Sequence, residues 1–139
     1  MLHPQIIVWE RESRIAPLLR DLATQERWVL RQPRQRGVCW DQLRQNTPTV
    51  FVIRMERPAD AELALLLQVK DECPRVAAVA IGVAEDADTL AGLCWDLGAD
   101  YALFPPLSRD LLPDVVRGLM QTRIKKESPP AAASGLDDF

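Results

Sequence analysis

Apolar residues along the chain fall into short continuous runs separated by longer stretches in which they recur every three or four positions. A short continuous run is typical of a strand covered on both faces, and the wider spacing is typical of a helix with one buried face. The runs predict five strands, at residues 5–9, 28–30, 49–53, 76–83 and 101–104. The stretches between and after them predict five helices, at residues 13–25, 38–45, 60–73, 89–97 and 108–123.

Strands and helices therefore alternate along the chain, and this alternation predicts an α/β fold. Parallel neighbouring strands need a right-handed crossover, which the helices supply on both faces of the sheet. We expect a three-layer, doubly wound, parallel five-stranded sheet of order 2-1-3-4-5, the flavodoxin-like arrangement. We expect one domain over residues 1–123, which 47% apolar residues can supply with a core, and a disordered tail over residues 124–139.

The segment from Gly98 to Ser108, G-A-D-Y-A-L-F-P-P-L-S, combines a helix stop, a short strand, a proline turn and a helix cap. It resembles the end of the receiver (CheY-like) domain of bacterial response regulators, which usually reads G-A-D-D-Y-L-x-K-P-F-S. The framework residues match, whereas the catalytic Lys is absent. The resemblance covers residues 5–123, and Pro58 stands where the family has a proline four residues after its phosphoacceptor Asp.

The resemblance implies a degenerate phosphoryl pocket. Where the family has two Mg²⁺-binding acids after its first strand, this chain has Trp9 and Glu10, and Arg54 stands at the phosphoacceptor Asp. Ile81 lies at the end of the fourth strand, where the family has Ser or Thr, and Phe104 takes the place of the Lys. We therefore expect a pseudo-receiver without a metal or cofactor, in which a Glu10–Arg54 contact neutralises the pocket.

The resemblance also implies a protein-interaction role. Receivers hold their Lys-Pro bond in the cis form, so we expect a cis bond between Phe104 and Pro105. They commonly dimerise or meet targets through the fourth helix, fifth strand and fifth helix, where this chain has Trp95, Tyr101 and Leu107. The partner would be a kinase, an output protein or a second copy of the chain.

Charge leaves a second function open, nucleic-acid binding. Residues 1–57 carry ten Arg against six acids, a balance of +4, and residues 58–139 carry seven bases against fourteen acids, a balance of −7. Arginines between residues 27 and 44 lie near Trp28 and Trp40, and aromatic rings among arginines are typical of single-strand binding. The pI of about 5.2 argues against a general polyanion binder, so we do not favour this function.

A third alternative is an enzyme on the same fold, of unknown substrate. The sequence has no glycine-rich phosphate loop after its first strand, and its only histidine, His3, precedes that strand. Three widely spaced cysteines set among apolar residues indicate reduced packing residues. The first eight residues lack the pattern of a signal peptide and no apolar run is long enough to span a membrane, so we expect a cytoplasmic protein without a membrane partner.

Overall fold

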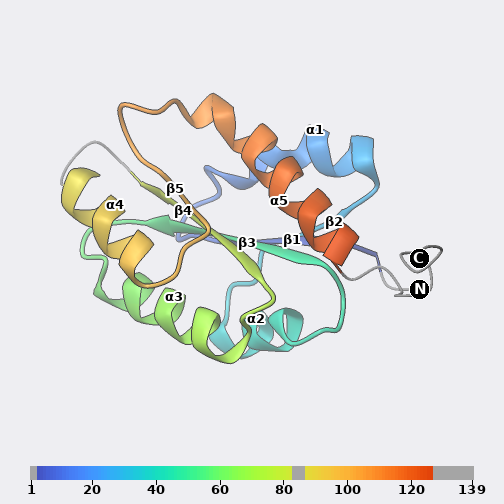
Figure 1. The fold of residues 1–139 in the computed structure, drawn as a ribbon, viewed down its shortest axis with the longest axis horizontal. Helices are drawn as coiled ribbons and strands as arrows, with labels where there is room; N and C mark the ends of the chain where they lie inside the picture. The colour runs from blue at the N-terminus through green and yellow to red at the C-terminus, as the bar shows by residue number, and fades with distance from the viewer. Residues whose placement is uncertain (1–2, 83–86, 127–139) are drawn as a thin grey trace, which may run out of the picture.

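The computed structural model describes residues 3–82 and 87–126, in which five strands alternate with five helices (Figure 1). The strands are β1 (Gln5–Trp9), β2 (Val29–Arg31), β3 (Thr49–Met55), β4 (Ala77–Gly82) and β5 (Tyr101–Leu103). The helices are α1 (Ala16–Glu26), α2 (Arg36–Leu43), α3 (Asp60–Glu72), α4 (Ala87–Asp96) and α5 (Leu112–Lys126), the last preceded by a 3₁₀ turn, Arg109–Leu111. All four strand pairings are parallel and the order is β2-β1-β3-β4-β5, which confirms the predicted fold.

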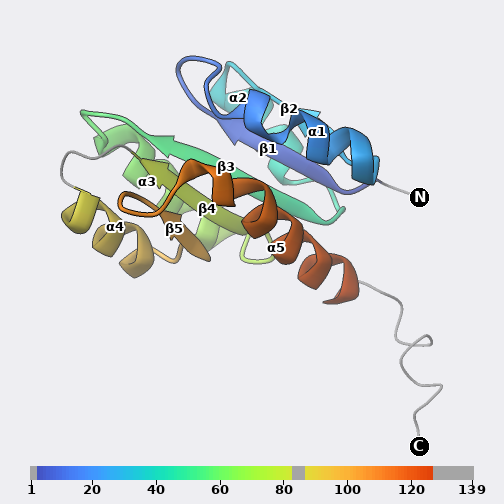
Figure 2. The same ribbon diagram turned by 90° about the horizontal axis from the view of Figure 1, so that it is seen from above.

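Helices cover both faces of the sheet. Helices α1 and α5 lie side by side on one face, and α2, α3 and α4 cover the other (Figures 1 and 2). The alternation of side chains along each strand divides the core accordingly: on β3, Phe51 and Ile53 face α2–α4, whereas Val50 and Val52 face α1 and α5. Over residues 50–53 strand β3 is thus apolar on both sides, as its continuous run predicted.

Two of the predicted helix ends are confirmed. Gly98 adopts a left-handed φ of 104° after α4, a conformation that costs little only for glycine. The hydroxyl of Ser108 accepts a hydrogen bond from the N–H of Asp110, at 3.1 Å, and so caps the turn that leads into α5.

Other helix ends differ from the prediction. Ser13 was expected to cap the first helix, but its hydroxyl donates to the side chain of Gln32 at 3.1 Å, and the helix begins only at Ala16. Asp60 is the first residue of α3 rather than its cap. Helix α5 continues to Lys126, three residues beyond the expected domain boundary, and the remainder of the predicted tail lies outside the described residues.

Strand β3 is longer than its apolar run, because it continues through Arg54 to Met55. The side chain of Met55 is buried among the core residues that face α2–α4, so the pleat keeps the strand apolar on that side. Arg54 is therefore part of the sheet, and alternation directs its side chain to the α1–α5 side.

Candidate functional site at the carboxyl ends of the strands

The residues of the predicted pocket come from strands whose carboxyl ends meet at one edge of the sheet. Trp9 pairs in register with Ile53, the residue before Arg54, and Arg54 pairs with Ile81. This edge is where open parallel sheets bind ligands. The structure thus brings the carboxyl ends of β1, β3 and β4 together. The side chains at these ends determine what the site can bind and which chemistry it can perform.

Glu10 is engaged with the start of α1. Its two carboxylate oxygens accept hydrogen bonds from the backbone N–H groups of Arg14, Ile15 and Ala16, at 2.9 to 3.0 Å. These are among the amides that a helix start leaves without intrahelical partners, and a carboxylate there is also favoured by the helix dipole. Glu10 therefore serves as the cap that the sequence assigned to Ser13.

Arg54 pairs with its near neighbour Glu56 and not with Glu10. Nη1 of Arg54 lies 3.5 Å from Oε1 of Glu56, and the Arg54 side chain is only 11% exposed. The contact is an ion pair without hydrogen-bond alignment, since the buried Nε and Nη1 atoms donate no hydrogen bond. The predicted Glu10–Arg54 ion pair is wrong, because the carboxylate of Glu10 is used by the backbone of α1.

Arg11 links the loop after β1 to the loop after β3. Its guanidinium donates to the carbonyl oxygens of Arg57 and Pro58, at 3.3 and 2.9 Å, and pairs with the carboxylate of Glu62 at 3.2 Å. The backbone N–H of Arg11 also lies 3.4 Å from a carboxylate oxygen of Glu56. A guanidinium can make several such contacts at once because it carries five donors in a planar fork.

The carboxylates of Glu56 and Glu62 at this edge thus each have an arginine partner. The side chain of Glu62 is 7% exposed, so its charge is largely withdrawn from solvent and compensated by Arg11. Within residues 3–82 and 87–126, no three His, Cys, Asp or Glu side chains converge as a metal site would require. Sequence reasoning missed Arg11 and Glu62, which are 51 positions apart and carry no local motif.

Phe104 and Ile81 are core residues. Phe104 is 3% exposed, and its ring lies so close to Gly82 that a Cβ there would meet ring carbon Cε2 at 2.1 Å. Ile81 is fully buried on the opposite side of the sheet, under α1 and α5. Phe104 therefore closes the end of β4 from the α3–α4 side and belongs to the core there.

The predicted cis bond between Phe104 and Pro105 is wrong. The cis bonds among the described residues are Arg57-Pro58 and Pro105-Pro106. Counted residue by residue from Gly98, the Lys-Pro pair of the receiver pattern falls on Pro105 and Pro106, so Pro105 rather than Phe104 stands in place of the Lys.

The predicted interaction face is partly exposed. Trp95 is 48% exposed and meets Tyr101 edge to face, with ring centroids 5.9 Å apart. Leu107, at 44%, and Leu111, at 39%, are also exposed, in the segment between β5 and α5. Large apolar side chains that remain exposed to solvent, as these do, are typical of surfaces that bind another protein.

The arginine-rich region lacks exposed tryptophan rings. Trp28 and Trp40 are each 9% exposed and belong to the two core layers. Arg44 lies over the ring of Trp40, with its central carbon 5.0 Å from the centroid, and pairs with Glu72 at 3.4 Å. Neither indole has a free face for a stacked base, so nothing here favours nucleic-acid binding.

The cysteines lie away from the strand ends and differ in exposure. Burial raises the pKa of the Cys39 thiol to about 12 and that of Cys94 to about 11. Cys73 is half-buried, and burial raises its pKa as well. Since the thiolate is the reactive form, none of the three has the lowered pKa of a nucleophilic cysteine. None of the helices in the described ranges is long and apolar enough to cross a membrane.

Comparisons with known proteins agree with this fold. No family model matches the chain, and no curated protein matches its sequence. A response regulator receiver domain from Clostridium thermocellum is similar in structure, with a TM-score of 0.69 and 19% identity over 88% of this chain and 98% of that chain. A response regulator from Thermotoga maritima has a TM-score of 0.69 and 14% identity, over 86% of this chain and 99% of that chain. The adenylate cyclase from Rhodopirellula baltica has a TM-score of 0.70 and 12% identity, over 91% of this chain and 94% of that chain.

The chain therefore has the CheY-like fold of response regulator receiver domains. At these identities the likeness establishes the fold alone. The role of the strand-end residues has to be argued from their own chemistry.

Proposed function

We propose that this protein is a non-catalytic signalling module, a pseudo-receiver that acts through protein contacts and does not undergo aspartyl phosphorylation. The observation that carries the proposal is the pairing of Arg54 with Glu56 and of Arg11 with Glu62 at the edge where receivers phosphorylate an aspartate.

The chemistry of the edge supports this. Phosphoryl transfer to a protein carboxylate needs a free carboxylate oxygen as the nucleophile and positive charge to offset the transferred group. The guanidinium of Arg54 has N–H donors but no acceptor lone pair, so it offers no nucleophile for attack on a phosphoryl group. Its fixed positive charge also opposes a divalent cation, and the acids that would hold the cation are occupied by α1, Arg11 and Arg54.

Magnesium titration tests this half of the proposal. We expect no saturable change in the ¹⁵N–¹H spectrum at Glu10, Arg11 or Arg54 as Mg²⁺ is added. Arg54→Asp restores a carboxylate but leaves the Arg11 contacts and lacks the Lys, so we expect it to remain unphosphorylated by acetyl phosphate. Saturable Mg²⁺ binding at these residues in the natural chain would refute the proposal.

The surface around α4, β5 and the start of α5 is the proposed contact face. Trp95 and Tyr101 form an aromatic pair at its centre, and Leu107 adds an exposed apolar side chain. Aromatic residues dominate the binding energy of many interfaces because they bury a large rigid area. The proposed partner is a kinase or an output protein, or a second copy of the chain.

Substitutions on this face test the second half. Leu107→Glu and Trp95→Ala should each weaken self-association in analytical ultracentrifugation, or capture of a partner identified by crosslinking, by about tenfold or more. Leu67→Glu is the matched control, since Leu67 is 51% exposed on α3 and lies outside this face. Equal loss in all three variants, or no loss in any, would remove the proposed face.

A further inference from the structure

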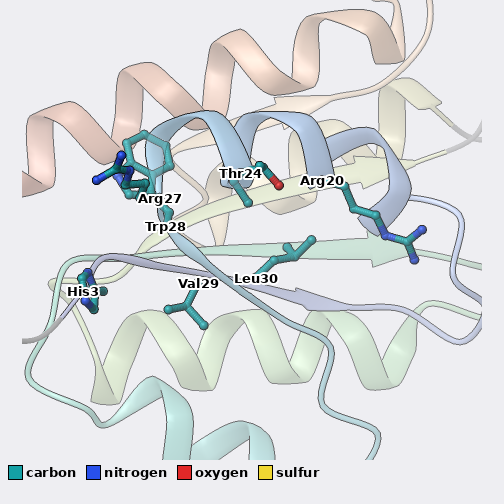
Figure 3. Close-up of a pocket in the computed structure, with 8 residues that line it drawn as sticks. His3, Arg20, Thr24, Arg27, Trp28, Val29 and Leu30 are labelled. Carbon is teal, nitrogen blue, oxygen red and sulfur yellow. The ribbon is translucent and has the colours of Figure 1, made fainter.

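A groove runs along the free edge of the sheet, beside β2. It has a volume of about 590 Å³ and lies between α1 and β2 (Figure 3). Apolar atoms of Ala23, Val29 and Leu30 line it, and Arg20, Arg27 and His3 stand around it. Strands β2 and β5 are the two edge strands of the sheet (Figure 2). The groove beside β2 is therefore on the opposite side of the sheet from β5, the strand that contains Tyr101.

The guanidinium groups of the two arginines have no partner among residues 3–82 and 87–126. Both side chains are exposed, and neither guanidinium makes a hydrogen bond or an ion pair there, unlike Arg11 and Arg54. None of the described residues that line the groove is acidic, and the carboxylate of Glu26, the residue before Arg27, pairs with Arg117 at 3.2 Å. The groove therefore presents uncompensated positive charge beside an apolar surface, on a chain whose net charge is −3.

The backbone at Arg27 is unusual. Arg27 has φ 61° and ψ 37°, and it is the one non-glycine residue among those described that has a positive φ. Glycine is favoured in this position after a helix, and a side chain here adds strain. Arg27 thus keeps a strained backbone conformation at a position where its side chain lines the groove.

Strand β2 leaves backbone groups available at the same place. The N–H of Val29 donates to the carbonyl of Pro4 at 2.9 Å, toward β1. Because backbone groups alternate along a strand, the N–H and C=O of Leu30 point to the open edge. An extended peptide placed there would find a donor and an acceptor in the geometry of strand addition.

We propose that this groove binds an extended acidic segment of a partner protein, which pairs with Leu30 through its backbone and with Arg20 and Arg27 through two carboxylates. The two arginines are seven positions apart, roughly 10 Å along the helix. In an extended chain, carboxylates two to four residues apart are separated by about 7 to 13 Å, which flexible arginines can bridge. An apolar side chain between the acids would lie on Val29.

A nucleic acid fits the groove less well. Trp28, the groove's indole, is 9% exposed and offers no face for stacking, and two arginines make a short track for a phosphate backbone. The peptide site and the proposed contact face lie at opposite edges of the sheet. The module would then hold two partners at once, which the function proposed above does not require.

Peptide titration tests the inference. The probe is a short fluorescein-labelled peptide in which valine alternates with aspartate, and its comparison probes are a valine–lysine peptide and single-stranded oligothymidine. We expect saturable, salt-sensitive binding of the acidic peptide alone, with ¹⁵N–¹H shift changes centred on residues 29–31. Arg27→Gly should weaken binding about three- to tenfold, and Arg20→Glu combined with Arg27→Glu should weaken it more than tenfold.

Two variants make the result specific. Arg27→Gly removes the guanidinium and relieves the backbone, so a weaker complex cannot be attributed to misfolding. Arg36→Glu removes an exposed arginine at the start of α2, outside the groove, and should leave the affinity within about twofold. The inference is overturned if the acidic peptide does not bind, if Arg36→Glu weakens it as much as Arg27→Gly, or if oligothymidine binds more tightly.

Discussion

Replacing Gly82 by alanine tests how Phe104 closes the end of β4. An added Cβ would lie 2.1 Å from Cε2 and 2.6 Å from Cδ2 of the Phe104 ring, whereas carbon atoms in contact are normally about 3.5 to 4.0 Å apart. The ring would have to move by about 1.5 Å, yet it is 3% exposed and enclosed by the core that faces α3 and α4.

The expected cost follows from that enclosure. Overpacking a filled core typically costs about 1–3 kcal/mol, and a displacement of this size places Gly82→Ala at about 2–4 kcal/mol. Phe104→Ala alone should cost about 3–5 kcal/mol through the cavity it leaves. In the double variant the new methyl group occupies part of that cavity, so the combined cost should be smaller than the sum by about 1.5–3 kcal/mol.

Urea denaturation of the natural protein, the two single variants and the double variant measures this coupling. The free energies of unfolding are compared among proteins whose free energy falls with urea concentration at the same slope, which indicates that they share one denatured state. Additive costs, within about 0.5 kcal/mol, would mean that residue 82 and the Phe104 ring do not meet, and would refute the arrangement of β4 and β5 at this edge.

Three further outcomes follow from the structure. Glu10→Ala should destabilise the protein by about 1–2 kcal/mol in thermal unfolding, because the amides at the start of α1 lose their acceptor; an unchanged midpoint would contradict this. Arg27→Gly should stabilise it by about 0.5–1 kcal/mol, the relief of the left-handed residue less the added flexibility of the unfolded chain; a loss of stability would contradict it. In native protein at pH 8, iodoacetamide should alkylate Cys73 first and leave Cys39 and Cys94 unmodified, as read by peptide mass spectrometry.

The two buried thiols also make stability depend on pH. Burial raises the pKa of Cys39 from 9.0 to about 12 and that of Cys94 from 9.0 to about 11. The stability that these protonated thiols contribute is therefore present below pH 9 and is lost as the pH rises toward 12.

The fold could be predicted from sequence because it depends on local pattern. The run Thr49–Ile53 is β-branched and aromatic, so it indicates a buried strand without knowledge of its neighbours. The parallel order then follows from the helix crossovers, and Gly98 and Ser108 mark helix ends through their own backbone chemistry.

The contacts at the strand ends could not be predicted in the same way. Arg11 and Glu62 meet only because β1 and β3 are neighbours in the folded sheet, and many arginine–glutamate pairs in the sequence are equally compatible with local rules. Glu10 was expected to face Arg54, but three backbone amides nearby offer a carboxylate more hydrogen bonds than one guanidinium. The contact of the Phe104 ring with Gly82 could not be predicted either, because it depends on the register of β4 and β5.

Phosphorylation is the most direct test of the central claim. The natural chain is incubated with acetyl phosphate, with and without Mg²⁺, beside a competent receiver domain as the positive control, and intact masses are measured. We expect no gain of a phosphoryl group, because we propose that Arg54 takes the acceptor position and because the surrounding carboxylates are engaged. A Mg²⁺-dependent mass gain of one phosphoryl group would contradict it.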